Sequence, residues 1–179
     1  MTRKEIKVEI INKNNFKDFG HIIERPSIKP NIDNDYERYW HECIDMKYFS
    51  NDPLLSFFET KKVQPICKSL LCIFNNSEAY INLGKSRLIV FVASSKGKFI
   101  CDESSIRAFL IKPGQSVEIS KGIWHFSPFP IDEDNEFLVM LGKKNVILGK
   151  NGEISLNPGE VIETNLENEY MVNINDLRF

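Results

Sequence analysis

The stretch SSIRAFLIKPGQSVEISKGIWHFSPFP, Ser104–Pro130, decides the fold. It contains two short runs rich in β-branched and aromatic residues, Ile106–Ile111 and Ser116–Ile119, which predict β-strands. Pro113-Gly114 separates them, and this pair is typical of a tight turn because proline fixes φ and glycine tolerates positive φ. The stretch therefore predicts two short strands joined by a tight turn.

A second bend follows the two runs at Gly122. A glycine next to a strand pattern marks a place where the backbone bends or passes close to another group. Trp124 and His125 come directly after it, and two more aromatic residues follow. We expect a functional site at His125, with burial as a merely hydrogen-bonded core histidine as the alternative.

The rest of the chain shows the same pattern of short apolar runs separated by Gly, Pro and Asn. Arg87–Ala93 is the most continuously apolar run, and its seven residues suit a strand of a barrel core better than a helix. Only Asn14–Phe19 predicts a short helix, with asparagine caps. The other predicted strands are Lys7–Ile11, His21–Glu24, Glu37–Met46, Leu54–Thr60, Pro65–Phe74, Glu78–Leu83, Glu136–Leu141, Asn145–Leu148, Gly152–Leu156 and Glu160–Thr164. This pattern indicates an all-β sandwich or barrel.

Two polar segments are predicted to lie outside the sheets. Arg25–Asp35 is rich in Pro, Asn and Asp and indicates a loop. The acidic segment at residues 165–169, NLENE, is predicted to be solvated. The 179 residues are expected to form one domain, residues 1–179.

Composition excludes several classes of function. A net charge of −2 and a pI near 6.0 argue against nucleic acid and anionic membranes as partners. We find no signal peptide and no run of about eighteen apolar residues, so we expect a cytoplasmic protein. The cysteines lack zinc-type spacing and are expected to be reduced, buried side chains: Cys43, Cys67, Cys72 and Cys101.

Several strings together resemble the ureidoglycolate lyase family. Gly114, Ser120, Gly122 and His125 follow the spacing of the second cupin motif, with Ser120 in place of the usual proline. The strings that resemble the lyase family are IRAFL, the Gly-x-Trp-His run, Pro-Phe-Pro, EFLV, FKDFGHIIE at Phe16–Glu24, ERYWHE at Glu37–Glu42 and SEAYINLG at Ser77–Gly84. The resemblance is strongest over residues 8–141.

The resemblance implies an all-β, cupin-like barrel of the RmlC-like jelly-roll type with little helix. It also implies an enzyme of allantoin and purine degradation that cleaves ureidoglycolate to glyoxylate and urea. A small carboxylate is then the ligand, and a homodimer is expected because cupins often pair through an exposed edge. Two alternatives stay open, since one fold hosts many functions: a cupin-like protein that binds a small molecule without lyase activity, and a sugar-acid isomerase or epimerase.

The resemblance also assigns candidate site residues. His125 and Glu78 are the candidates for proton transfer, with His41 behind them, because a histidine or carboxylate can act as the base on the substrate hydroxyl. If a divalent metal binds, weakly, His125 and Glu78 are its ligands. Four positions depart from the family pattern and make the expected pocket more apolar: Leu71, Ile73, Ile119 and Phe126.

Arg107 and Arg38 are the candidates for the substrate carboxylate, since a guanidinium binds carboxylates through two parallel hydrogen bonds. Trp124 is expected to contact the substrate beside His125. Arg107 alternates with Ile106 and Ala108, so the sequence leaves open whether it faces the pocket or the solvent.

Overall fold

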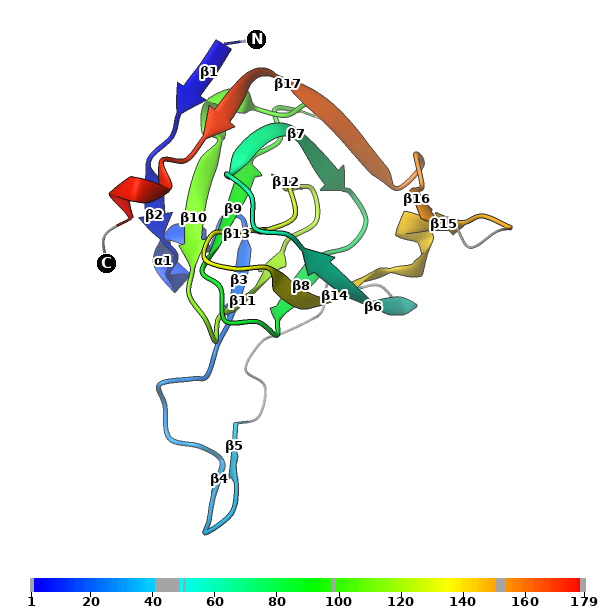
Figure 1. Cartoon of the computed structure of the whole chain (residues 1–179). Coiled ribbons are helices and arrows are strands. Elements are labelled where there is room, and N and C mark those ends of the chain that lie inside the picture. Colours follow the sequence, from blue (N-terminus) through cyan, green and yellow to red (C-terminus); the bar gives the residue numbers. More distant parts are fainter. Residues whose placement is uncertain (1, 41–48, 50, 98, 151–153, 178–179) are drawn as a thin grey trace.

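The computed structural model describes residues 2–40, 49, 51–97, 99–150 and 154–177. These residues form two main sheets, which curl around each other into a cupin-like barrel (Figure 1). Sheet A has the strand order β1 (Thr2–Glu5), β17 (Val161–Met171), β7 (Ile66–Ile73), β12 (Trp124–His125), β9 (Leu88–Ala93), β10 (Arg107–Ile111) and β2 (Val8–Ile10), with β13 (Phe129–Pro130) also paired to β9. The all-β, cupin-like prediction is confirmed.

Sheet B is antiparallel and faces sheet A. Its strand order is β3 (Gly20–Ile23), β11 (Ser116–Ile119), β8 (Glu78–Asn82), β14 (Asn135–Gly142) and β6 (Pro53–Thr60). Two hairpins lie outside these sheets: β4 (Ile32–Asp33) with β5 (Arg38–Tyr39), and β15 (Val146–Leu148) with β16 (Ile154–Leu156). The helical elements are α1 (Lys13–Phe16) and three short 3-10 turns, Glu103–Ser105, Lys143–Asn145 and Ile174–Asp176.

The two predicted strands are present as β10 and β11, which belong to different sheets and are joined by the predicted turn. The turn between them has Gly114 at φ +81°, and the backbone N–H of Gln115 donates to the carbonyl of Lys112. Gly122 has φ +80°, a left-handed conformation that glycine adopts without a steric penalty. Both predicted bends are therefore confirmed.

Strand β9 explains why the run at residues 88–93 is apolar throughout. Its alternate residues enter two different hydrophobic clusters, one between the sheets and one on the other face of sheet A. Every residue of β9 is at most 1% exposed. A strand buried on both faces reads as a continuous apolar run, because no position faces water.

The barrel interior is filled by side chains from both sheets and from α1. Phe16, Phe19 and Phe109 pack together there, with ring centroids 5.2–6.1 Å apart. Asn12 caps α1 and accepts hydrogen bonds from the backbone N–H groups of Asn14 and Asn15, as the asparagine-rich sequence predicts. This packing closes one end of the barrel.

The segment at residues 165–169 was predicted to lie outside the sheets, which was wrong, because it continues β17. Asn165 and Glu167 are exposed there, as predicted, while Glu169 pairs with Arg3 and Lys68. Of the predicted strand Glu37–Met46, residues 41–46 lie outside the described residues, and the described part forms β5 at Arg38–Tyr39. β5 pairs with β4 in a hairpin that projects away from the barrel (Figure 1). Among the described residues, no helix has the length and apolarity to cross a bilayer.

Candidate active site

A buried histidine–carboxylate pair connects the two sheets. His125 lies on β12 of sheet A, and Glu78 lies on β8 of sheet B. The Nε2 atom of His125 is 2.8 Å from Oε2 of Glu78. The side chains of His125 and Glu78 are 1% and 10% exposed, respectively. The structure thus brings together the two residues that the sequence predicted for proton transfer.

The bend at Gly122 places His125 in this position. The N–H of Gly122 donates to the carbonyl of Ile73 on β7, and its carbonyl accepts from the hydroxyl of Ser95. The chain then pairs with β7 and β9, where Leu71 and Val92 flank His125. Residues directly opposite in antiparallel strands point to the same face, so His125 points into the barrel with Val92.

The contacts of His125 determine how many protons the pair holds. Nδ1 lies 2.9 Å from the carbonyl oxygen of Ile123, which can only accept, so Nδ1 carries a hydrogen. The short Nε2–Oε2 contact then needs one more hydrogen, either on the imidazole or on the carboxyl group. The pair therefore holds a single shared proton at this contact, and Oε1 of Glu78 has no hydrogen-bond partner among the described residues.

Tyr80 and Ser127 extend the pair into a polar cluster. The hydroxyl of Tyr80 donates to Oε2 of Glu78 over 3.2 Å, and it lies 3.4 Å from Oγ of Ser127. Burial, followed by the neighbouring Glu78 carboxylate, raises the pKa of Tyr80 well above its ordinary value. The phenol therefore stays protonated and remains a hydrogen-bond donor at neutral pH.

The polar cluster borders a cavity of about 230 Å³. Glu78, Tyr80 and Ser127 lie on its polar side, and its remaining wall is mostly apolar: Phe57, Phe58, Val139, Leu141 and Val146. The sequence reasoning missed Tyr80 and Ser127. Tyr80 could have been found from its spacing, because residues two apart on a strand share a face and Glu78 was already a candidate.

The donor set at the site does not fit a metal ion. Among the described residues, no group of three or more His, Cys, Asp or Glu side chains could hold one. Both ring nitrogens of His125 are engaged by Ile123 and Glu78. Leu71, at an expected ligand position, lies directly opposite His125 and offers no donor atom. No step of the reaction at this site is therefore assigned to a metal ion.

Arg107 lies on the inner face of sheet A but is held away from the pair. The strand register aligns Arg107, Val92 and His125 in one row across β10, β9 and β12. The guanidinium of Arg107 is bound through two nitrogens by the carboxylate of Glu9 and donates to the carbonyl of Asn15. Arg107 therefore lies on the same face of sheet A as His125, and its ion-pair partner is Glu9.

The structure does not bring Arg38 or Trp124 to the His125–Glu78 pair. Arg38 lies on the projecting hairpin and pairs with Asp33 over 3.0 Å. Trp124 is fully buried in the cluster on the opposite face of sheet A, because neighbouring residues of a strand point to opposite faces. Its indole N–H donates to the hydroxyl of Ser95. His41 lies outside the described residues.

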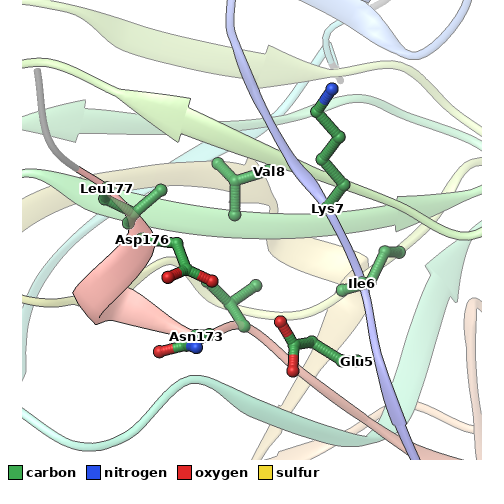
Figure 2. A pocket seen from close by; sticks show the side chains of 8 residues that line it. Glu5, Ile6, Lys7, Val8, Asn173, Asp176 and Leu177 are labelled. Atoms are coloured by element: carbon green, nitrogen blue, oxygen red, sulfur yellow. The ribbon is translucent and has the colours of Figure 1, made fainter.

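A larger cavity of about 500 Å³ lies elsewhere, between β1, β2 and the C-terminal 3-10 turn. Figure 2 shows Glu5, Asn173 and Asp176 around it, with Lys7 directed away. None of the described residues that line this cavity is a histidine or a cysteine. The smaller cavity beside Glu78 is therefore the better candidate for proton-transfer chemistry.

Comparison with known proteins gives matches to one family. A family profile described as ureidoglycolate lyase matches residues 3–172. A ureidoglycolate lyase of Burkholderia cepacia is 27% identical over 141 residues, which cover 75% of this chain and 78% of the relative. A ureidoglycolate lyase of Pseudomonas aeruginosa (strain LESB58) is 25% identical over 142 residues, covering 76% and 83%. Because the profile spans nearly all of the chain, this protein belongs to the ureidoglycolate lyase family.

Proposed function

We propose that the protein is a lyase that cleaves ureidoglycolate to glyoxylate and urea. The observation that carries this proposal is the buried His125–Glu78 pair, which borders a cavity in a chain that matches the family over residues 3–172. A catalytic base is needed to take the proton of the substrate's carbinol hydroxyl. Glu78 is that base, and Oε1 is the atom that acts, because Oε2 is already engaged by His125 and Tyr80.

The reaction balances with Glu78 as a proton shuttle. Oε1 takes the hydroxyl proton, the carbon–oxygen double bond of glyoxylate forms, and the carbon–nitrogen bond to urea breaks. The same carboxyl group then returns the proton to the leaving nitrogen, which regenerates the carboxylate. His125 holds Oε2 and stabilises the ionised Glu78, since a hydrogen bond to the charged form favours that form.

The direct test measures glyoxylate and urea release by the purified protein, with and without added divalent metal. We expect release without a metal requirement. Glu78→Gln removes the base and keeps the shape of the side chain, so kcat should fall on the order of a hundredfold or more. His125→Gln should also lower kcat, because it removes the partner that holds Glu78.

Glu118→Gln is the matched control. Glu118 is a second buried carboxylate, 2.8 Å from Nδ1 of His21, and it lies on β11 with its side chain on the outer face of sheet B. We expect activity near that of the wild type. Equal losses in Glu78→Gln and Glu118→Gln would mean that the effect is structural. Binding of a small molecule without any release would favour the alternative of a non-catalytic cupin.

We also propose that the protein is a cytoplasmic homodimer. The cytoplasmic location is supported by free thiols at Cys67, Cys72 and Cys101. The homodimer is supported by apolar side chains on β6 that face solvent, because Leu55 and Phe57 are 60% and 62% exposed. The binding of the substrate carboxylate by Arg107 stays a proposal, which the kinetics of an Arg107 variant can test.

A further inference from the structure

Tyr80 occupies a central position in the polar cluster. Its ring is 3% exposed and packs edge-on against His125 and Phe137, with ring centroids 6.4 and 6.1 Å away. It lies on β8 two residues after Glu78, so both side chains project into the barrel. The aromatic contacts fix the ring, and the ring fixes the position of its hydroxyl.

The hydrogen bonds around the hydroxyl have one consistent direction. A phenol has a single hydrogen, and the carboxylate of Glu78 can only accept it. The contact between Tyr80 and Ser127 then requires Ser127 to be the donor. The cluster is therefore a chain in which Ser127 donates to Tyr80, and Tyr80 donates to the same oxygen of Glu78 that His125 contacts.

We propose that Tyr80 is a positioning residue for the lyase reaction, which holds Oε2 of Glu78 so that Oε1 faces the cavity as an ionised base. This inference rests on the proposed function. Two groups hold Oε2, His125 from sheet A and Tyr80 from the strand of Glu78 itself. With only one of them, the carboxylate could rotate about its last bond and exchange its two oxygens.

Other charges near the pair are neutralised or exposed to solvent. Arg107 shares the inner face of sheet A but is bound by Glu9. Glu163, opposite Leu71 on β17, is exposed and accepts from the hydroxyl of Ser69. Sheet B contributes apolar residues from β11 and β14 to the interior, including Ile119 and Val139. Among the described residues, the groups that act directly on Glu78 are therefore Tyr80 and His125.

Tyr80→Phe tests this proposal because it removes the hydroxyl and keeps the ring contacts. We expect kcat to fall about tenfold with little change in KM, since a hydrogen bond to a charged group is lost.

Tyr170→Phe is the matched control. Tyr170 is also buried, and its hydroxyl lies 3.3 Å from a carboxylate oxygen of Glu103, far along the chain from the site and in the other hydrophobic cluster. We expect this variant to lose some stability and to keep the wild-type kcat and KM. A wild-type kcat for Tyr80→Phe would overturn the proposal.

A second measurement separates this inference from the proposed function. Nitrogen-15 NMR of the histidine rings, recorded at one fixed pH and without any substrate, reports how the hydrogen between Nε2 of His125 and Oε2 of Glu78 is shared. We expect Tyr80→Phe to shift the Nε2 resonance of His125 and Tyr170→Phe to leave it unchanged. If the wild type releases no glyoxylate but the resonance still shifts, the lyase proposal fails, while the hydrogen bond by which Tyr80 holds Oε2 is supported. An unshifted resonance overturns the positioning role whatever the activity.

Discussion

Arg107 is a half-buried charged residue on the inner face of sheet A, and it has an ion-pair partner there. Its guanidinium lies over the rings of Phe19 and Phe109, 5.5 and 4.7 Å from their centroids, and Glu9 binds it from β2. The hydrogen bond from Arg107 is the main reason why the pKa of Glu9 is lowered. The ion pair joins β2 to β10 beside the end of the barrel that α1 closes.

Arg107→Met and Glu9→Gln should each destabilise the fold, and a double-mutant cycle should give a coupling of about 1 kcal/mol, as for partly exposed pairs. Because the pKa of Glu9 is lower in the folded protein than its ordinary value of 4.5, the coupling is present above that pH and is lost as the pH falls. Denaturant unfolding of the wild type and the variants at pH 7 and at pH 3 measures the coupling and its loss at low pH.

Enzyme kinetics of the same two variants decide whether Arg107 also serves the substrate. A rise in KM confined to Arg107→Met would support a role in carboxylate binding. Equal kinetic effects of the two substitutions would mean that Arg107 has a structural role, as the ion-pair partner of Glu9.

At the residue scale, the sequence correctly predicted candidate site residues that lie side by side, where the spacing of a motif identified them. His125 and Glu78 were identified from motif spacing, and the structure places them 2.8 Å apart. The face of Arg107 could not be read from alternation, because the partner that allows its burial, Glu9, lies 98 residues away. Trp124 was predicted to share a site with its neighbour His125. It does not, because adjacent residues of a strand point to opposite faces.

Among the elements that the structure describes, β6 exposes two large apolar side chains, Leu55 and Phe57. It is the last strand of sheet B, and its outward residues Leu55 and Phe57 lie beside Met140 and Leu138 of β14. An apolar edge strand favours association with another chain. This surface is where we expect the second copy of a homodimer to bind.

Leu55→Lys tests the homodimer because it places a charge on this surface at a position that does not itself line the cavity. Analytical ultracentrifugation should show a dimer for the wild type and a shift toward monomer for the variant. Ile28→Lys, on the loop that leads into the projecting hairpin, is the control, since Ile28 is even more exposed at 70%. A wild-type monomer, or equal dissociation of both variants, would contradict the assignment to β6.

Element bounds were well predicted wherever apolar residues and turn residues alternate. The predicted runs Ser116–Ile119 and Leu54–Thr60 correspond to β11 and β6 with at most one residue of difference. β1 was missed because all four of its residues are exposed, so no apolar pattern marks it. It forms because β17 offers a free edge, which is a property of the tertiary structure.

For the molecule as a whole, three buried or half-buried thiols predict a loss of stability in alkali. Burial raises the pKa of Cys67 and of Cys72 to about 12, and that of Cys101 to about 11, from an ordinary value of 9.0. Because these pKa values are raised in the folded state, the thiols contribute their full stabilisation below pH 9. That contribution is lost as the pH rises toward 11 and 12. The free energy of unfolding, measured in denaturant from pH 8 to pH 11, should therefore decrease.

Alkylation with iodoacetamide at pH 8, read residue by residue by mass spectrometry, provides an independent check. Cys67 and Cys72 should react slowly in the folded protein and quickly after unfolding, because the thiolate is the reactive form. Rapid labelling of Cys72 in the native state, or a stability that stays level to pH 11, would contradict the assigned burial.

The parallel pairing of β1 with β17 has a consequence for how this protein matures. Thr2 pairs with Asn168 and Arg3 binds Glu169, across a separation of 166 residues. β1 therefore has no partner until β17 has been synthesised. Sheet A is completed only then, and contacts of such high sequence separation slow folding. During synthesis, the apolar residues that β17 later covers are an expected binding site for chaperones.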